Sequence, residues 1–175
     1  MRSVSALVPH PGGKMEPMTA TLTSTGSTAA VIVTHQRAEL LRASLEQVVH
    51  QTHPVQWVIV VDNGAENAVR ELVESMAGDH GVYVPSETNL GGAGGFALGF
   101  LTALSLGADA VWCADDDGRP ADHAVLAELY QVAGANRLHE VSPAVCNIDD
   151  PGRLAFPLRQ GLVWRRRMDE LEGDF

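Results

Sequence analysis

The alternation of apolar and polar positions divides the chain into short apolar runs and longer stretches with helical spacing. Runs typical of buried strands cover residues 29–34, 57–61, 82–85, 110–114 and 141–148. Apolar residues recur every three or four positions, as on one face of a helix, over residues 38–51, 66–77, 89–106 and 122–136. Strands that alternate with helices predict an α/β protein whose mostly parallel sheet has helices on both faces.

Three further features complete this pattern. Residues 1–28 are rich in Pro, Gly, Ser and Thr and are predicted to form a disordered leader. Residues 154–158 and 162–164 are predicted to pair as a hairpin. The helix expected over 89–106 is predicted to bury one apolar stripe, made of Phe96, Ala97, Phe100, Leu101 and Leu104.

The charge balance argues against a general nucleic-acid-binding protein. The formal net charge is −10 and the isoelectric point about 5.0, whereas phosphate backbones select basic surfaces. The densest basic cluster, Arg165 to Arg167 after Trp164, is either a solvated charge run or a contact for an anionic headgroup or a diphosphate. No apolar stretch approaches the roughly 18 residues of a membrane span, which leaves attachment at a membrane surface open.

The two cysteines indicate a reducing compartment. Cys113 and Cys146 each lie in an apolar run, and they are predicted to be reduced thiols of the core rather than a disulfide. The predicted location of the chain is therefore the cytoplasm.

Three adjacent carboxylates end the run 110–114. Asp115, Asp116 and Asp117 repel one another, and a cation or water must neutralise their charge. Hard oxygen ligands suit Mg²⁺ or Mn²⁺. In an extended backbone Asp115 and Asp117 project to one side, where they can share a metal, and Asp116 projects to the other, where it can meet a polar group. The alternative is a solvated acidic turn.

Other polar residues follow the earlier strands at the same expected edge of the sheet. Thr34 and Arg37 follow the first run, and Asp62 follows the second. Because ligands of open α/β sheets bind outside the carboxyl ends of the strands, these residues should meet the triplet in one crevice. A nucleotide fits such a crevice, since Arg37 can pair with phosphate and Asp62 can accept a hydrogen bond from a base or ribose.

The glycine-rich segment 89–95 has competing interpretations. Gly92-x-Gly94-x-x-Ala97 fits a relaxed dinucleotide fingerprint, which makes an NAD(P)-binding oxidoreductase domain the alternative function. Against it, two β/α units precede the segment, and Ser86 to Gly91 separate the first fingerprint glycine, Gly92, from the preceding strand. A third interpretation is a helix start that needs glycine for close packing.

Four segments together resemble the inverting family 2 glycosyltransferases of the GT-A fold, a Rossmann-like nucleotide-diphospho-sugar-binding domain. They are Val31 to Arg37, Val60 to Asn63, Asn89 to Phe96, and Asp115 to Gly118. With Val141 to Pro143 and Trp164 to Arg167 added, the chain resembles more narrowly the galactofuranosyltransferases that begin the galactan of the actinobacterial arabinogalactan cell wall.

The resemblance implies transfer of galactofuranose from UDP-galactofuranose to a rhamnosyl-N-acetylglucosaminyl-diphospho-polyprenol, at the inner face of the cell membrane. It implies a bound Mn²⁺ or Mg²⁺ on Asp115 and Asp117, with Asp116 beside the ribose and diphosphate. The remaining positions that it assigns to the donor nucleotide-sugar are Thr34, Arg37, Asp62, Asn89 and Gly92.

One required group has no match. An inverting transferase needs a carboxylate base for the acceptor hydroxyl, and the family places it well beyond the metal motif, so it is expected beyond Phe175. Residues 29–148 are therefore predicted to form the UDP-sugar-binding domain, and 149–175 the start of an acceptor-side region in a C-terminally incomplete chain. Alone, the chain is expected to bind UDP and to turn over little or nothing; a non-enzymatic sugar-nucleotide-binding fragment is the third hypothesis.

Overall fold

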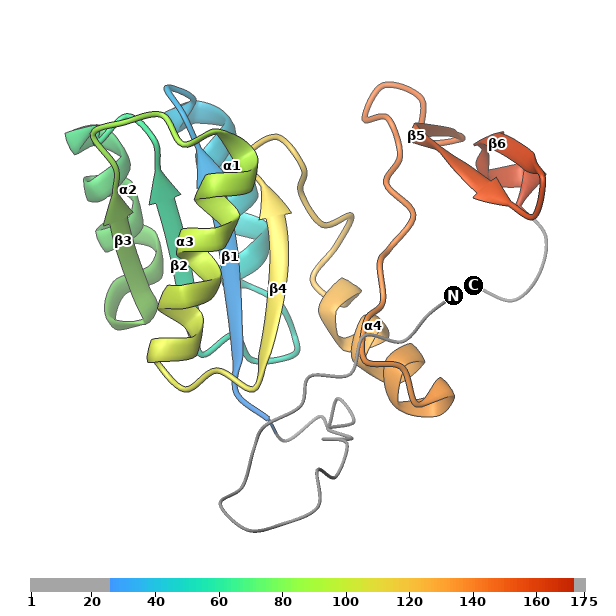
Figure 1. The fold of residues 1–175 in the computed structure, drawn as a ribbon, viewed down its shortest axis with the longest axis horizontal. Helices are drawn as coiled ribbons and strands as arrows, with labels where there is room; N and C mark the ends of the chain where they lie inside the picture. Colours follow the sequence, from blue (N-terminus) through green and yellow to red (C-terminus); the bar gives the residue numbers. More distant parts are fainter. Residues whose placement is uncertain (1–25, 172–175) are drawn as a thin grey trace, which may run out of the picture. The chain divides into compact units, whose positions relative to one another are not determined.

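The computed structural model describes residues 26–171, which form two compact units. The first unit extends to Val141 and holds the α/β sheet, and the second begins at Ser142 and holds a small hairpin (Figure 1). The predicted leader falls mainly on residues outside the described range, and the first strand begins at Thr28. No helix within residues 26–171 is long and apolar enough to cross a membrane.

Four parallel strands form the sheet of the first unit, in the order β3-β2-β1-β4. All seven residues of the central strand β1 are buried, as its β-branched sequence predicts. The strands are β1 (Thr28–Thr34), β2 (Trp57–Asp62), β3 (Gly81–Pro85) and β4 (Ala110–Asp115). The α/β prediction and its first four strands are confirmed.

Helices cover both faces of this sheet (Figure 1). One face packs under α1 and α2 through a core that includes Ile32, Leu45 and Val73, and the other packs under α3. At the start of α4, the Gln51 side chain accepts a hydrogen bond from the backbone N–H of Leu126 at 2.8 Å. The helices are α1 (Ala38–Val49), α2 (Asn67–Ala77), α3 (Gly91–Ser105) and α4 (Val125–Asn136).

Helix α3 packs through small residues, so the predicted apolar stripe was wrong except for Phe96, which is partly buried against the core. Gly95, Gly99 and Ala103 are its buried positions, whereas Phe100, Leu101 and Leu104 are exposed. A Cβ added at Gly99 would lie 2.3 Å from a methyl group of Val31, and one at Gly95 would lie 2.5 Å from a methyl group of Val33. Because α3 lies so close to β1, the face of the helix that packs on the sheet consists of small residues and not of the larger apolar ones.

Strand β4 lies at an edge of the described sheet, and only alternate residues of it are covered. Val111 and Cys113 are exposed on one face, whereas Trp112 and Ala114 pack against the core under α1 and α2. The prediction of two core cysteines was therefore wrong for Cys113, and Cys146 is only partly buried. Both thiols are free.

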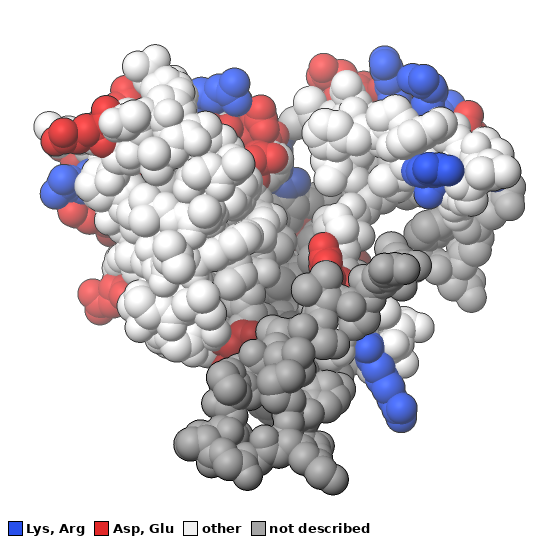
Figure 2. Space-filling view, viewed as in Figure 1, with Lys and Arg blue, Asp and Glu red and all other residues white. Residues whose placement is uncertain are grey.

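The second unit consists mainly of an antiparallel hairpin, as predicted, formed by β5 (Arg153–Gln160) and β6 (Val163–Arg167). Residues 141–148 were predicted to be a strand, but only an isolated bridge between Cys146 and Leu154 forms there. Pro143 interrupts that apolar run and cannot donate to a ladder. Figure 2 shows basic and acidic side chains on the visible faces of both units.

Candidate functional site

The carboxyl ends of three parallel strands bring the predicted site residues to one edge of the sheet. Thr34 at the end of β1 is in register with Asp62 at the end of β2, and Val33 is in register with Asp115 at the end of β4. The backbone N–H of Asn63 also donates to the carbonyl of Thr34 at 2.9 Å. The predicted convergence of these residues is therefore found in the structure.

The middle carboxylate of the triplet faces inward. Asp116 is 5% exposed, and its Oδ2 accepts a hydrogen bond from the hydroxyl of Thr34 at 2.8 Å. Its Oδ1 lies 3.4 Å from Nη1 of Arg37, and the same nitrogen lies 3.1 Å from Oδ2 of Asp117. One arginine thus bridges two carboxylates of the triplet, and the expectation that Asp116 would meet a polar group is confirmed.

Asp115 and Asp117 remain exposed at the mouth of the site. Partial burial raises the pKa of Asp115, and the neighbouring charges of Asp117 and Asp116 raise it further, although Arg37 opposes them. Below the triplet, the hydroxyl of Ser44 donates at 3.4 Å to the backbone carbonyl of Asp115. The triplet is therefore anchored from α1 while two of its carboxylates face solvent.

The residues of the triplet fit a hard divalent cation in chemistry, but they are not arranged as a complete metal site. Within residues 26–171 no three His, Cys, Asp or Glu side chains converge on one point. Asp115 and Asp117 nevertheless offer oxygen ligands, and a cation would relieve the repulsion that raises the pKa of Asp115. Remaining ligands would have to come from water and from the phosphates of a substrate.

Asp62 is fully buried and organises the turn after β2. Its Oδ1 accepts from the backbone N–H of Gly64 at 2.9 Å. Its Oδ2 accepts from the backbone N–H of Glu66 at 2.6 Å and from the hydroxyl of Tyr83 at 2.9 Å. Three donors therefore already occupy the carboxylate that the sequence assigns to a base or ribose.

We expect the hydroxyl of Tyr83 to have a pKa well above that of a free phenol. Burial raises its pKa most, and the hydrogen bond to Asp62 adds to this, which together bring it to about 12. Because the folded pKa exceeds the unfolded value near 10, the stability from this contact is intact below about pH 10 and is lost as the pH rises toward 12. Absorbance titration of a Tyr130→Phe variant, which leaves Tyr83 as its one tyrosine, should show this late transition; a midpoint near pH 10 in the folded protein would contradict it.

The glycine-rich segment is tied to the end of β2 by Asn63. The side chain of Asn63 accepts from the backbone N–H of Leu90 and donates to the carbonyl of Gly91, both at 3.3 Å. Asn89 accepts from the backbone N–H of Gly91 at 2.9 Å, and Gly91 has a φ of +66°. Gly92 is exposed, with open space where a Cβ would be. The segment therefore presents backbone at the same edge as the triplet.

The family follows from comparison with known proteins. The model of the family described as glycosyl transferase family 2 matches residues 29–173, which include the whole sheet and the hairpin. The chain belongs to glycosyl transferase family 2. This membership removes the NAD(P)-dependent oxidoreductase alternative, and it agrees with the position of the glycines, since Gly95 and Gly99 are needed for helix packing.

Two curated relatives are galactofuranosyltransferases. The chain is 57% identical over 153 residues to galactofuranosyltransferase GlfT1 of Mycolicibacterium smegmatis, which covers 87% of the chain and 50% of that protein. It is 56% identical over 149 residues to GlfT1 of Mycobacterium tuberculosis, which covers 84% of the chain and 49% of that protein. The chain therefore spans about half the length of the curated relatives that it matches.

A solved structure supports the GT-A fold of this family 2 glycosyltransferase. The mannosyltransferase PcManGT from Pyrobaculum calidifontis, solved in complex with GDP-Man and Mn²⁺, superposes with a TM-score of 0.51 over 73% of this chain and 38% of that one. At 20% identity the likeness concerns the fold alone. The predicted α/β, GT-A class is confirmed.

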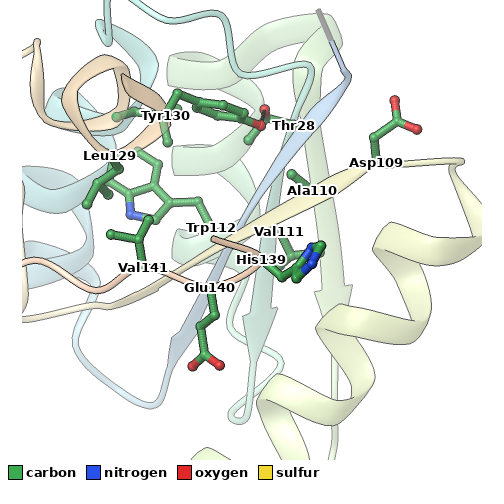
Figure 3. Close-up of a pocket in the computed structure, with 11 residues that line it drawn as sticks. Thr28, Asp109, Ala110, Val111, Trp112, Leu129, Tyr130, His139, Glu140 and Val141 are labelled. Carbon is green, nitrogen blue, oxygen red and sulfur yellow. Dashed lines mark hydrogen bonds between the residues drawn. The ribbon is translucent and has the colours of Figure 1, made fainter. Parts of the chain in front are cut away.

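A pocket of about 260 Å³ lies elsewhere in this member of glycosyl transferase family 2. It is lined by the start of β4, by Thr28 at the start of β1, and by Tyr130 of α4, whose hydroxyl lies 2.6 Å from that of Thr28 (Figure 3). Trp112 and Val141 also line it. Because the starts of parallel strands lie opposite their carboxyl ends, this pocket is separate from the candidate site.

Sequence reasoning missed several residues that shape the site. Asn63 and Tyr83 hold the turn after β2 and the glycine-rich segment, and Ser44 supports the triplet from α1. His35 follows Thr34 directly, and its Nδ1 is buried without a hydrogen-bond partner among the described residues. An asparagine directly after a strand-ending aspartate was the available signal for Asn63, whereas the contacts of Ser44 and Tyr83 depend on tertiary packing.

Proposed function

We propose that this chain is the donor-binding part of a metal-dependent, inverting galactofuranosyltransferase that uses UDP-galactofuranose. The observation that carries the proposal is the 56–57% identity to two GlfT1 galactofuranosyltransferases over 149–153 residues. The match includes the strand ends and the glycine-rich segment that form the candidate site. The acceptor that we propose is a rhamnosyl-N-acetylglucosaminyl-diphospho-polyprenol.

In this proposal the diphosphate of the donor lies at the triplet. Asp115 and Asp117 would hold Mn²⁺ or Mg²⁺, which supplies charge neutralisation for the departing UDP. Arg37 lies within 3.4 Å of Asp116 and Asp117 and is half exposed, so its guanidinium can also reach a phosphate. Asp116, fixed by Thr34, would face the ribose and diphosphate.

The uridine is proposed to lie across the ends of β1 and β2. Thr34, Asp62 and the segment with Asn89 and Gly92 lie at this edge, and Gly92 leaves open space for a ligand. Asp62 has one acceptor position left on Oδ1 after its three internal hydrogen bonds. Its contribution would therefore be to hold the turn as well as to accept from the base or ribose.

The acceptor side of the reaction is proposed to depend on residues outside this chain. The general base is expected beyond Phe175, so donor binding without appreciable transfer is the expected behaviour of the 175-residue protein. Because a polyprenyl-linked acceptor resides in a membrane, we propose that the complete enzyme works at the cytoplasmic face of the cell membrane as a peripheral protein.

Calorimetric titration with UDP tests the donor site. We expect binding in Mn²⁺ that weakens at least about tenfold in EDTA, since removal of a divalent cation costs several kcal/mol of phosphate interaction. In a variant with Asp115→Ala and Asp117→Ala, Mn²⁺ should no longer improve the affinity. UDP-galactofuranose should displace bound UDP more readily than UDP-glucose does.

An acidic residue away from the site provides the control. Asp79 lies in the turn before β3 and is exposed, so Asp79→Ala should bind UDP as the unmodified chain does. Failure of a folded chain to bind UDP, or Mn²⁺-dependent binding that survives the double substitution, would overturn the assignment of the triplet.

A further inference from the structure

The hairpin β5–β6 concentrates positive charge in an acidic protein. Residues 153–167 contain five arginines and no Asp or Glu, whereas the chain as a whole has a net charge of −10. The remainder of the chain is therefore more acidic still. Four acidic residues flank the hairpin, so the excess of positive charge is confined to its two strands and turn; they are Asp149, Asp150, Asp169 and Glu170.

Not all five arginines are available for an external ligand. Arg167 is paired with Asp150 at 3.4 Å and with Asp169 at 3.5 Å, and both acidic residues lie where the strands enter and leave the hairpin. Arg165 also has interactions within the protein. Arg159 and Arg166, by contrast, are exposed, and their guanidinium groups form no ion pair among residues 26–171. Nε of Arg159 donates to the carbonyl of Gly161 at 3.0 Å, and the backbone N–H of Arg166 donates to Oε2 of Glu170 at 2.7 Å.

Large apolar side chains lie on the same hairpin as Arg159 and Arg166. Leu162 at the turn is 89% exposed, Phe156 is 68% exposed and Trp164 is 60% exposed. Trp164 is the direct cross-strand partner of Arg159, so the two side chains project from the same face of the hairpin, and Arg166, two residues along β6, projects from it too.

We infer that the face of this hairpin that holds Arg159, Trp164 and Arg166, together with Leu162 at its turn, is a docking surface for an anionic phospholipid membrane. Tryptophan favours the interface between headgroups and acyl chains, and arginine places its charge among lipid phosphates while its stem stays in apolar surroundings. The exposed Leu162 at the turn supplies apolar surface, and its transfer from water into the membrane interface would lower the free energy. The inference rests on the peripheral membrane association proposed above and names the surface that provides it, and its test is independent of the donor chemistry.

The strength of this docking should depend on the number of arginines whose guanidinium group forms no ion pair within the described residues. A basic residue near an anionic membrane strengthens binding by about fivefold. Loss of both Arg159 and Arg166 should therefore weaken binding by about 25-fold, and added salt should weaken the binding of the unmodified chain.

Co-sedimentation of the 175-residue chain with lipid vesicles tests the docking, without any UDP-sugar present. We expect binding to vesicles of phosphatidylcholine with phosphatidylglycerol at low salt, and little binding to phosphatidylcholine alone. The variant Arg159→Gln with Arg166→Gln should lose about 25-fold in affinity. The matched control, Arg42→Gln with Arg137→Gln, carries the same change in net charge on exposed residues of the first unit and should bind as before.

Quenching by brominated acyl chains gives a second readout. Tryptophan fluorescence of the bound protein should fall on brominated vesicles, and Trp164→Phe should remove most of this quenching while it still binds. Equal losses in the two double-arginine variants, absence of binding at low salt, or binding only when a polyprenyl diphosphate is in the vesicle would each overturn the inference; the last would indicate that the hairpin recognises the diphosphate of an acceptor. Circular dichroism should confirm that each variant is folded.

Discussion

Replacement of Gly99 by Val should lower the free energy of unfolding by about 3 kcal/mol or more. A Cβ at this position would meet the Val31 methyl group at 2.3 Å, and Val61 lies 3.4 Å away on the neighbouring strand. Both neighbours are β-branched residues of a buried sheet, which have few alternative rotamers. Helix α3 would have to move away from β1 and open the core on that face. Urea unfolding followed by circular dichroism measures the loss.

Gly92 provides the matched control in the same helix. Nothing lies within 4 Å of a Cβ built there, and the residue is exposed. Gly92→Ala should therefore leave the stability unchanged or raise it by up to about 1 kcal/mol, because alanine is the better helix former. A Gly99→Val protein as stable as the unmodified chain would mean that α3 does not need its close approach to the sheet.

Replacement of Asp62 by Ala should cost about 3 kcal/mol or more of stability. The substitution leaves the backbone N–H groups of Gly64 and Glu66 without their acceptor, and it leaves the hydroxyl of Tyr83 with only the backbone carbonyl of Glu66, at 3.3 Å. The three donors are only partly buried, so each lost hydrogen bond costs about 1 kcal/mol. Tyr83→Phe removes one of the three donors and should have a smaller effect, about 1 kcal/mol. Thermal and urea unfolding of both variants measure the difference.

The same Asp62 variant distinguishes a structural role from a ligand contact. If Asp62→Ala unfolds as readily as the unmodified chain but no longer binds UDP, the carboxylate acts mainly on the nucleotide, and the stability argument fails. Asp79→Ala removes an exposed carboxylate from the same unit and should change neither the unfolding midpoint nor the affinity for UDP.

The fold was predictable to the extent that each element showed its own periodicity. The β-branched runs that became β1 and β2 are buried on both faces, which is the arrangement that a continuous apolar run favours. Helix α3 was located correctly, but its buried face was not. Periodicity selects the larger apolar residues, whereas the distance between α3 and β1 admits only Gly95, Gly99 and Ala103.

The site was predictable in outline because parallel strands end at a common edge. The inward position of Asp116 followed from the alternation of an extended backbone, and Thr34 could be expected near it. The pairing of Arg37 with two carboxylates could not be predicted, because it depends on how the chain turns after β1, where Gln36 has a φ of +56°. The use of Asp62 as the centre of a turn was likewise set by Tyr83 on another strand.

The small buried face of α3 has a consequence for the behaviour of the protein in solution. Gly95, Gly99 and Ala103 face the sheet. The larger side chains of Phe100, Leu101 and Leu104 are therefore exposed to water, and this apolar surface favours self-association. Electrostatic repulsion between molecules, from the net charge of −10, opposes their association through this area at neutral pH. Colloidal stability is therefore lowest near the isoelectric point of about 5.0, and acidic buffers are the conditions to avoid in purification.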